Sequence, residues 1–165
     1  MAEVSTVQPQ RLNGYEICTD PRRIDLDRVH HWLSTDAYWA LGRSRETMER
    51  AIAGSLSYGL FRTADAAQVG YARAVTDGVT FAWLCDVYID PGERGNGLGG
   101  WLVGTVRDDL WARGVRRMLL ATADAHGVYA RLGFTELADP DRWMEIDART
   151  AVKPVARSRP LTVEP

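Results

Sequence analysis

One glycine-rich stretch decides the fold of this chain: Val87-Tyr-Ile-Asp-Pro-Gly-Glu-Arg-Gly-Asn-Gly-Leu-Gly-Gly100. It follows an apolar segment, Val79–Ile89, which predicts a buried strand near the centre of a sheet. It leads into a segment whose apolar residues recur at helical spacing, which predicts a helix from Leu98 that ends at Gly114. The stretch is therefore a turn from a central strand into a helix.

The glycines of this turn predict an anion site. Gly95, Gly97 and Gly99 let successive backbone N–H groups turn inward without obstruction by side chains. The helix start adds unpaired N–H groups and the positive end of the helix dipole, and Arg94 adds a full positive charge. Such a turn favours a phosphate or a diphosphate. The alternative is a tight turn that needs glycine for its backbone conformation alone.

Two nucleotide-binding motifs compete for the same residues. No Gly-Lys-Ser/Thr ending is present, which excludes a P-loop. The spacing Gly-x-Gly-x-x-Gly is met through Gly95, Gly97 and Gly100, but in a dinucleotide fold these glycines follow the strand almost at once, within a first βαβ unit. Here Asp90–Arg94 intervene, three antiparallel-looking strands come first, and little chain follows. An NAD(P)-dependent oxidoreductase is the weaker hypothesis.

Outward from the turn, strand and helix patterns alternate. The expected strands are Tyr15–Thr19, Ser57–Arg62, Val69–Thr76, Val79–Ile89, Arg116–Thr122, Phe134–Leu137 and Arg142–Ile146. Two helices are expected after the capping residues Asp25 and Ser44, a third from Leu98 and a short fourth over Ala123–Leu132. The fold class is therefore α/β, with a mixed, mostly antiparallel central sheet of about seven strands flanked by helices. We expect one domain over residues 14–147, with loose tails at 1–13 and 148–165.

Composition narrows the function classes. A chain of 165 residues with 45% hydrophobic and 25% charged residues is typical of one soluble domain, which requires no stabilising disulfide or metal. The 20 basic and 22 acidic residues argue against nucleic-acid binding driven by bulk positive charge. No apolar stretch approaches the ~20 residues of a membrane span, and the 2 cysteines indicate reduced thiols. We expect a cytoplasmic protein without membrane or nucleic-acid partners, and we predict no metal site.

The turn also resembles the acyl-CoA-binding signature of the GNAT superfamily of N-acetyltransferases. That signature, Arg/Gln-x-x-Gly-x-Gly/Ala, is met by Arg94, Gly97 and Gly99. A second segment, Ala125–Phe134, is similar to the family's Ala-x-x-x-Tyr-x-x-x-Gly-Phe. The predicted order of elements fits the family as well. One residue departs from it, because many members carry Asn where this chain has Thr122.

The resemblance implies acetyl-CoA as co-substrate. Its diphosphate would lie on the turn, and its pantetheine would run along the edge of the preceding strand as an extra strand would, since in the family this strand splays from the next. The residues expected to bind it are Val87, Tyr88, Ile89, Arg94, Gly95, Asn96, Gly97, Leu98, Gly99, Gly100 and His126.

Acyl transfer to an amine needs a neutral amine, a donor for the oxyanion and a proton for the departing thiolate. Backbone N–H groups over Val87–Ile89 would supply the donor. By resemblance Tyr129 is the general acid, although a packing tyrosine is the alternative. Asp86 is the lone acid in a buried strand, so burial would raise its pKa and suit it to be the general base. A structural hydrogen-bond acceptor is the alternative. Cys85 beside it predicts inert packing.

The resemblance builds the acceptor site from the first two helices, their connection and the last strands. Trp32, Tyr38 and Trp39 lie in that region, where aromatic rings hold an amine or anchor the connection to the core. The leading hypothesis is an N-acetyltransferase that acts on a primary amine of a small molecule or peptide by direct attack in a ternary complex. A non-catalytic acyl-CoA-binding regulator on the same fold is the alternative. The resemblance also allows a homodimer.

Overall fold

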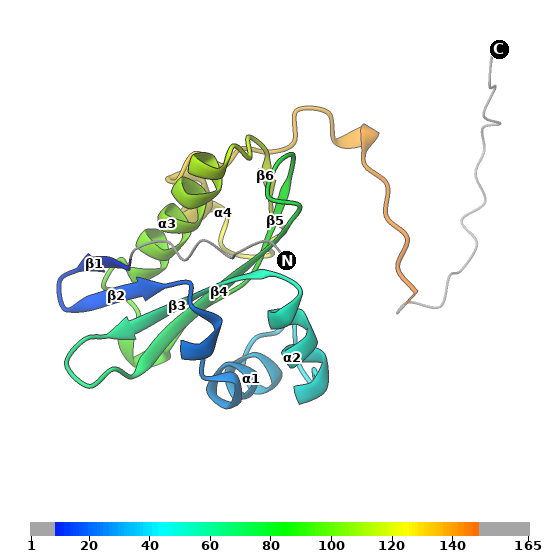
Figure 1. Ribbon diagram of the computed structural model, residues 1–165. Helices are drawn as coiled ribbons and strands as arrows, with labels where there is room; N and C mark the ends of the chain where they lie inside the picture. Colours follow the sequence, from blue (N-terminus) through cyan, green and yellow to red (C-terminus); the bar gives the residue numbers. More distant parts are fainter. Residues whose placement is uncertain (1–8, 149–165) are drawn as a thin grey trace, which may run out of the picture. The chain divides into compact units, whose positions relative to one another are not determined.

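The computed structural model describes residues 9–148, and six strands form one sheet in the order β1-β2-β3-β4-β5-β6 (Figure 1). The strands are β1 Gln10–Leu12, β2 Tyr15–Cys18, β3 Leu56–Arg62, β4 Gln68–Thr76, β5 Ala82–Ile89 and β6 Met118–Leu119. The helices are α1 Leu26–Thr35, α2 Arg45–Ala53, α3 Leu98–Arg113 and α4 His126–Ala130, with single 3-10 turns at Pro21–Arg23, Pro91–Glu93 and Pro140–Arg142. Neighbouring strands run antiparallel except β5 and β6, which are parallel. The expected α/β class and mixed sheet are confirmed.

The helices cover both faces of this sheet (Figure 1). On one face α3 packs through Leu102, Val106 and Leu110 against small and branched residues of the strands. On the other face α1 and α2 pack through Val29 and Met48, which are both 0% exposed. The central strands therefore lie between two apolar layers, which the predicted apolar strand pattern required.

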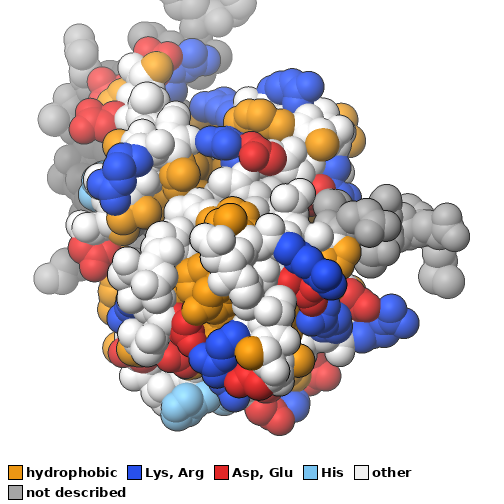
Figure 2. All heavy atoms as spheres, turned by 90° about the vertical axis from the view of Figure 1, so that its left-hand side faces the viewer, with side chains coloured by type: hydrophobic (Ala, Val, Ile, Leu, Met, Phe, Trp, Pro, Cys, Tyr) orange, Lys and Arg blue, Asp and Glu red, His pale blue; other side chains and the backbone are white. Residues whose placement is uncertain are grey.

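Charge is mixed on the face that carries β1 and β2. Figure 2 shows basic and acidic side chains interspersed there among apolar ones, in keeping with the net charge of −2. Within residues 9–148, no helix combines the length and the apolar composition that crossing a membrane requires.

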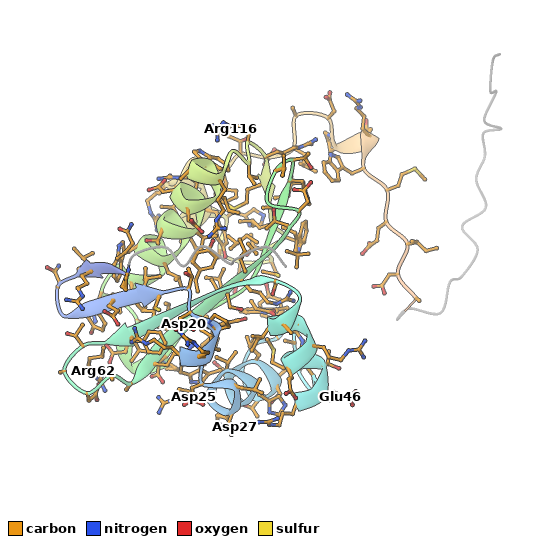
Figure 3. The ribbon with its side chains drawn as sticks, viewed as in Figure 1. Asp20, Asp25, Asp27, Glu46, Arg62 and Arg116 are labelled. Atoms are coloured by element: carbon orange, nitrogen blue, oxygen red, sulfur yellow. The ribbon has the colours of Figure 1, made fainter. Side chains whose placement is uncertain are left out.

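Local signals determine where the helices begin. The Asp25 carboxylate accepts from the Arg28 N–H at 3.0 Å and caps α1 (Figure 3), and the Ser44 hydroxyl accepts from the Thr47 N–H at 3.1 Å and caps α2. Helix α3 ends at Gly114, whose φ of 102° lets its N–H turn back to the Trp111 carbonyl at 3.1 Å. These boundaries match the predicted ones.

The sequence predictions were wrong at both ends of the described chain. β1 lies within the segment 1–13 where no regular element was expected, and the rest of the two predicted tails lies largely outside the described residues. Contacts divide the chain into two units, Met1–Phe134 and Thr135–Pro165. In the described part of the second unit neither predicted strand forms. The Arg142 and Trp143 N–H groups bond back to the Asp139 and Pro140 carbonyls in a 3-10 turn, which uses the backbone groups that a strand would need.

Candidate functional site

The sheet opens where β5 leaves β6. The two strands pair only at Ala82 with Met118 and at Trp83 with Leu119. In the described chain, no strand pairs with β5 on that side beyond Trp83, while β4 continues beside it as far as Ile89. The outer edge of β5 over Val87, Tyr88 and Ile89 is therefore available to an extended ligand.

A β-bulge at Asp86 interrupts β5 at this opening. Asp86 has φ of 53°, a left-handed conformation that few residues except Gly, Asn and Asp adopt, and the register with β4 shifts between Tyr71 and Arg73. The bulge reverses the alternation of side chains. Leu84 and, after the bulge, Val87 both pack on the α3 side, although residues three apart in a regular strand point to opposite faces. The one extra residue at the bulge shifts the period of two.

The Asp86 carboxylate lies at the centre of an ion-pair cluster. Its Oδ2 accepts from Arg43 Nη1 at 2.7 Å and from Arg73 Nε at 2.5 Å, and its Oδ1 accepts from Trp39 Nε1 at 3.2 Å. Burial acts to raise its pKa, but the two guanidinium groups outweigh burial and hold the pKa of Asp86 below its usual value. The expectation of a raised pKa is therefore wrong, and a carboxylate held this way is a poor general base.

The connection between α1 and α2 carries an exposed aromatic pair. The Tyr38 and Trp39 rings meet edge to face with centroids 4.9 Å apart, and they are 51% and 42% exposed. The Tyr38 hydroxyl accepts from the Ala123 N–H at 3.1 Å, so the pair reaches from the Asp86 cluster to the segment before α4. The structure thus brings the predicted acceptor residues Tyr38 and Trp39 next to the Asp86 bulge of β5.

Trp32 belongs to a different environment from the other two predicted acceptor residues. It is 6% exposed and stacks on Tyr88 with ring centroids 5.3 Å apart. The Tyr88 hydroxyl in turn donates to Asp36 at 2.5 Å. Both rings thus pack between α1 and the sheet, and only the backbone of Tyr88 remains for the predicted ligand. The pair borders a hollow of about 550 Å³ lined by Arg28, His31, Trp32, Thr35, Asp36, Tyr88, Asp90 and Pro91.

Tyr129 lies in α4 and packs edge to face on Phe134, with ring centroids 5.7 Å apart. Burial is the main cause that raises its pKa, with smaller contributions from Tyr38 and Asp124. The phenol is therefore fully protonated at neutral pH and is able to donate a proton. His126, at the start of the same helix, is exposed.

Cys85 precedes the bulge. Burial raises the pKa of its thiol to about 11, so at neutral pH it is a thiol rather than the reactive thiolate. A nucleophilic role for this residue has no support.

The glycine turn offers open space at the start of α3. A Cβ added at Gly95, Gly97 or Gly100 would meet no atom within 4 Å, and Gly95 and Gly97 have φ of 87° and 74°. The first backbone bond into the helix runs from the Trp101 N–H to the Gly97 carbonyl, which leaves the N–H groups of Leu98, Gly99 and Gly100 free of that ladder. The open space and the free N–H groups are what the predicted diphosphate site requires.

Arg94 is half exposed at the mouth of the turn. Its Nε donates to the Ile89 carbonyl at 2.9 Å, and its Nη2 lies 3.4 Å from the Asp36 carboxylate. The guanidinium group also lies 5.2 Å from the centre of the Tyr88 ring. These contacts orient Arg94 between the end of β5 and α1. The side-chain amide of Asn96 donates to the Glu93 carbonyl at 3.3 Å, so Asn96 also bonds within the turn.

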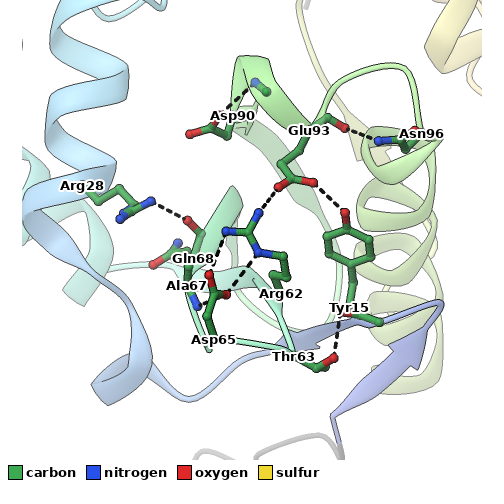
Figure 4. Close-up of polar contacts among 12 residues, drawn as sticks. Tyr15, Arg28, Arg62, Thr63, Asp65, Ala67, Gln68, Asp90, Glu93 and Asn96 are labelled. Atoms are coloured by element: carbon green, nitrogen blue, oxygen red, sulfur yellow. Dashed lines mark hydrogen bonds and ion pairs between the residues drawn. The ribbon is translucent and has the colours of Figure 1, made fainter.

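Glu93 anchors the turn to the rest of the sheet (Figure 4). Its carboxylate accepts from the Tyr15 hydroxyl of β2 at 2.6 Å and from the Arg62 guanidinium of β3. Arg62 is also paired with Asp65 at 2.8 Å. Two strands far away in sequence therefore determine the position of the loop that precedes α3.

Sequence reasoning missed Arg73, Glu93, Tyr15 and Arg62. Arg73 carried a usable signal, because a charged residue between Ala72 and Ala74 in an apolar strand requires a buried partner, and Asp86 stands alone in the next strand. Glu93 and its partners carried none, because an acidic residue in a turn looks like any solvated charge.

Comparisons with known proteins identify what the chain is similar to. A model described as the acetyltransferase (GNAT) family matches residues 26–134. A curated protein of Gibberella zeae, whose name assigns it provisionally to the acetyltransferases, is 30% identical over an alignment 160 residues long, and the match covers 86% of this chain and 90% of that protein.

Solved structures show the same fold. A crystal structure of a protein from Xanthomonas campestris pv. campestris that belongs to the GNAT family is 40% identical with a TM-score of 0.76, covering 83% of this chain and 95% of that one. A predicted acetyltransferase from Clostridium acetobutylicum, solved with acetyl-CoA, is 15% identical with a TM-score of 0.61 and covers 81% of this chain and 94% of that one.

Proposed function

This chain belongs to the acetyltransferase (GNAT) family and is an acyltransferase, and we propose that it transfers the acetyl group of acetyl-CoA to a primary amine of a small molecule or peptide. The observation that carries the proposal is the free edge of β5, which opens beyond Trp83 and leads directly into the glycine turn at the start of α3. The two free cysteines fit a reducing compartment, so we assign the reaction to the cytosol.

The backbone groups along this opening match the parts of acetyl-CoA. The backbone N–H groups from Gly95 to Gly100 and the dipole of α3 would hold the diphosphate, with Arg94 adjacent to it. The backbone of Val87–Ile89 would pair with the pantetheine amides as a neighbouring strand would. The acetyl-CoA present in the Clostridium acetobutylicum structure, which shares this fold, supports the same assignment. The thioester then lies near the Asp86 bulge.

Two groups of the chain would act on the reacting atoms. A backbone N–H released from the β4 ladder at the bulge would donate to the oxyanion that forms when the amine nitrogen attacks the thioester carbonyl carbon. As the carbon–sulfur bond breaks, Tyr129 would give its phenolic proton to the leaving thiolate. Its raised pKa keeps that proton in place until the thiolate forms.

Deprotonation of the amine needs no carboxylate base here. The Asp86 carboxylate is 1% exposed, bound by two guanidinium groups and lowered in pKa, so it would not accept the proton from an ammonium group. The amine would lose its proton to water, and the amide product would form by direct attack within the ternary complex. Asp86 acts instead as a positioning residue for the α1–α2 connection.

The test measures thiol release from acetyl-CoA with a panel of amines. Tyr129→Phe should lower kcat by about 10²-fold or more, while the affinity for CoA stays unchanged. Tyr38→Phe is the comparison variant, because it removes a second tyrosine hydroxyl of this region, which bonds to the Ala123 N–H and has no proposed part in the proton transfer. An unaltered kcat in Tyr129→Phe would remove Tyr129 from the mechanism. If no amine releases thiol although CoA binds, the catalytic proposal is wrong.

A further inference from the structure

The cluster at the bulge holds more positive than negative charge. Arg43 and Arg73 both donate to Oδ2 of Asp86, so two guanidinium charges face one carboxylate. The other titratable neighbours, Tyr71 and Cys85, add no negative charge at neutral pH, because burial raises the pKa of both. One net positive charge therefore remains among side chains that are only 20% and 14% exposed for the two arginines. Such a charge favours an anionic partner.

Arg73 also keeps donors that the protein does not use. Its Nε bonds to Asp86, but within residues 9–148 its two terminal nitrogens donate to no protein acceptor. In that part of the chain, Thr19 Oγ1 is the one side-chain polar atom that is fully buried without a partner, so the terminal nitrogens of Arg73 reach solvent. A guanidinium fork with free nitrogens matches a carboxylate in a two-bond arrangement.

The cluster lies beside the proposed reaction centre. Asp86 immediately precedes Val87, and Trp39 joins the cluster to the exposed Tyr38 ring. We propose that the acceptor is a small primary amine that carries a carboxylate, which Arg43 and Arg73 bind while the amine lies against β5. This inference rests on the proposed function and names its substrate class. A carboxylate matches the single excess charge, whereas a phosphate monoester carries about −1.5 to −2 at neutral pH.

Matched acceptors test the assignment. Thiol release is measured with L-amino acids, with their α-carboxamides and with O-phosphoethanolamine. The best amino acid should exceed its carboxamide by at least about 10-fold in kcat/KM, even though the carboxamide has the larger neutral-amine fraction. Carboxamides that match or exceed the acids, or a preference for the phosphate, would overturn the carboxylate site.

A binding experiment tests the carboxylate site without any turnover. N-acetyl-amino acids and their amides are titrated by calorimetry into the protein saturated with CoA. The acids should bind at least about 10-fold more tightly than the amides. Equal affinities, or binding of neither, refute the carboxylate site even when a neutral amine releases thiol. Selective binding of the acids without thiol release from any amine retains the site and refutes the proposed reaction.

Variants of the two arginines test whether Arg43 and Arg73 cause the preference for a carboxylate. Arg73→Lys keeps the charge but loses the planar fork, so it should raise KM for the carboxylate acceptor by about 10-fold with the affinity for CoA unchanged. Arg43→Lys gives the second variant if Arg73→Lys fails to fold. Arg45→Lys on the surface of α2 is the matched control and should behave as wild type. Loss of discrimination in Arg45→Lys, or its retention in both other variants, contradicts the proposal.

Discussion

Replacing Asp86 by alanine should destabilise the protein strongly, because it leaves two largely buried guanidinium groups without their anion. Removing one partner of a buried ion pair costs about 3–5 kcal/mol. The two arginines remain 20% and 14% exposed, so solvent will hydrate part of their charge and the lower end, about 3 kcal/mol, applies. For a domain of this size each kcal/mol lowers Tm by about 2–4 °C, which gives a loss of about 6–12 °C.

The stabilisation by Asp86 should change with pH in a definite direction. The folded pKa of Asp86 lies below the unfolded value of about 3.9. The stabilisation is therefore complete above pH 3.9 and is lost as the pH falls through the folded pKa. The difference in unfolding free energy between wild type and Asp86→Asn should be constant from about pH 5 to 8 and should shrink below about pH 4. Asparagine is the better comparison here, because it tolerates the φ of 53°.

The assays are urea unfolding followed by tryptophan fluorescence at pH 7 and at pH 3.5, and thermal melting at pH 7. Asp27→Ala is the control, because Asp27 is 79% exposed in its pair with Arg45 on the outside of α1 (Figure 3). That variant should melt within about 2 °C of wild type. If Asp86→Ala unfolds within about 0.5 kcal/mol of wild type at pH 7, the cluster does not stabilise the fold and the reasoning is refuted.

Two further predictions concern the glycine turn and its anchor. Tyr15→Phe removes the 2.6 Å bond to Glu93 and should raise KM for acetyl-CoA several-fold with kcat unchanged, as steady-state kinetics at saturating amine will measure; a fall in kcat with unchanged KM would contradict the anchoring role. Gly97→Ala forces alanine to φ of 74° and should cost about 1 kcal/mol and weaken acetyl-CoA binding, whereas Gly104→Ala within α3, where a Cβ meets nothing within 4 Å, should stabilise by about 0.5–1 kcal/mol. Thermal melting and calorimetric titration check both glycine variants, and equal effects at the two glycines would show that the conformation of Gly97 is unimportant.

The order of most helices and strands, and several helix boundaries, were predictable from short-range signals in the sequence. Asp25, Ser44 and Gly114 mark helix boundaries through hydrogen bonds that span only a few residues, so the sequence alone predicts these boundaries. The strand, turn and helix around Gly97 form a local unit as well. The family resemblance followed from the same residues, which is why the fold and the reaction class were predicted correctly.

The candidate site depended on contacts that no local pattern encodes. The sequence identified Asp86 as a lone buried acid, but its pKa was expected to be raised and is lowered in the structure. Its partners Arg73 and Arg43 lie 13 and 43 residues away, and they lower a pKa that burial alone would raise. Trp32 was expected to bind the acceptor because it is aromatic and lies in the expected region, but its ring packs on Tyr88. The predicted strands Phe134–Leu137 and Arg142–Ile146 do not form in the described chain.

What the amino-acid order alone determined is the succession of elements and the glycine turn, because capping, period and backbone freedom act over a few residues. What tertiary structure decided is the bulge at Asp86, the opening of β5 from β6 and the charge of the cluster beside them. These features arise where distant strands meet. Hydrogen-bond register and desolvation act there across the sheet, and neither leaves a mark on neighbouring residues in the chain.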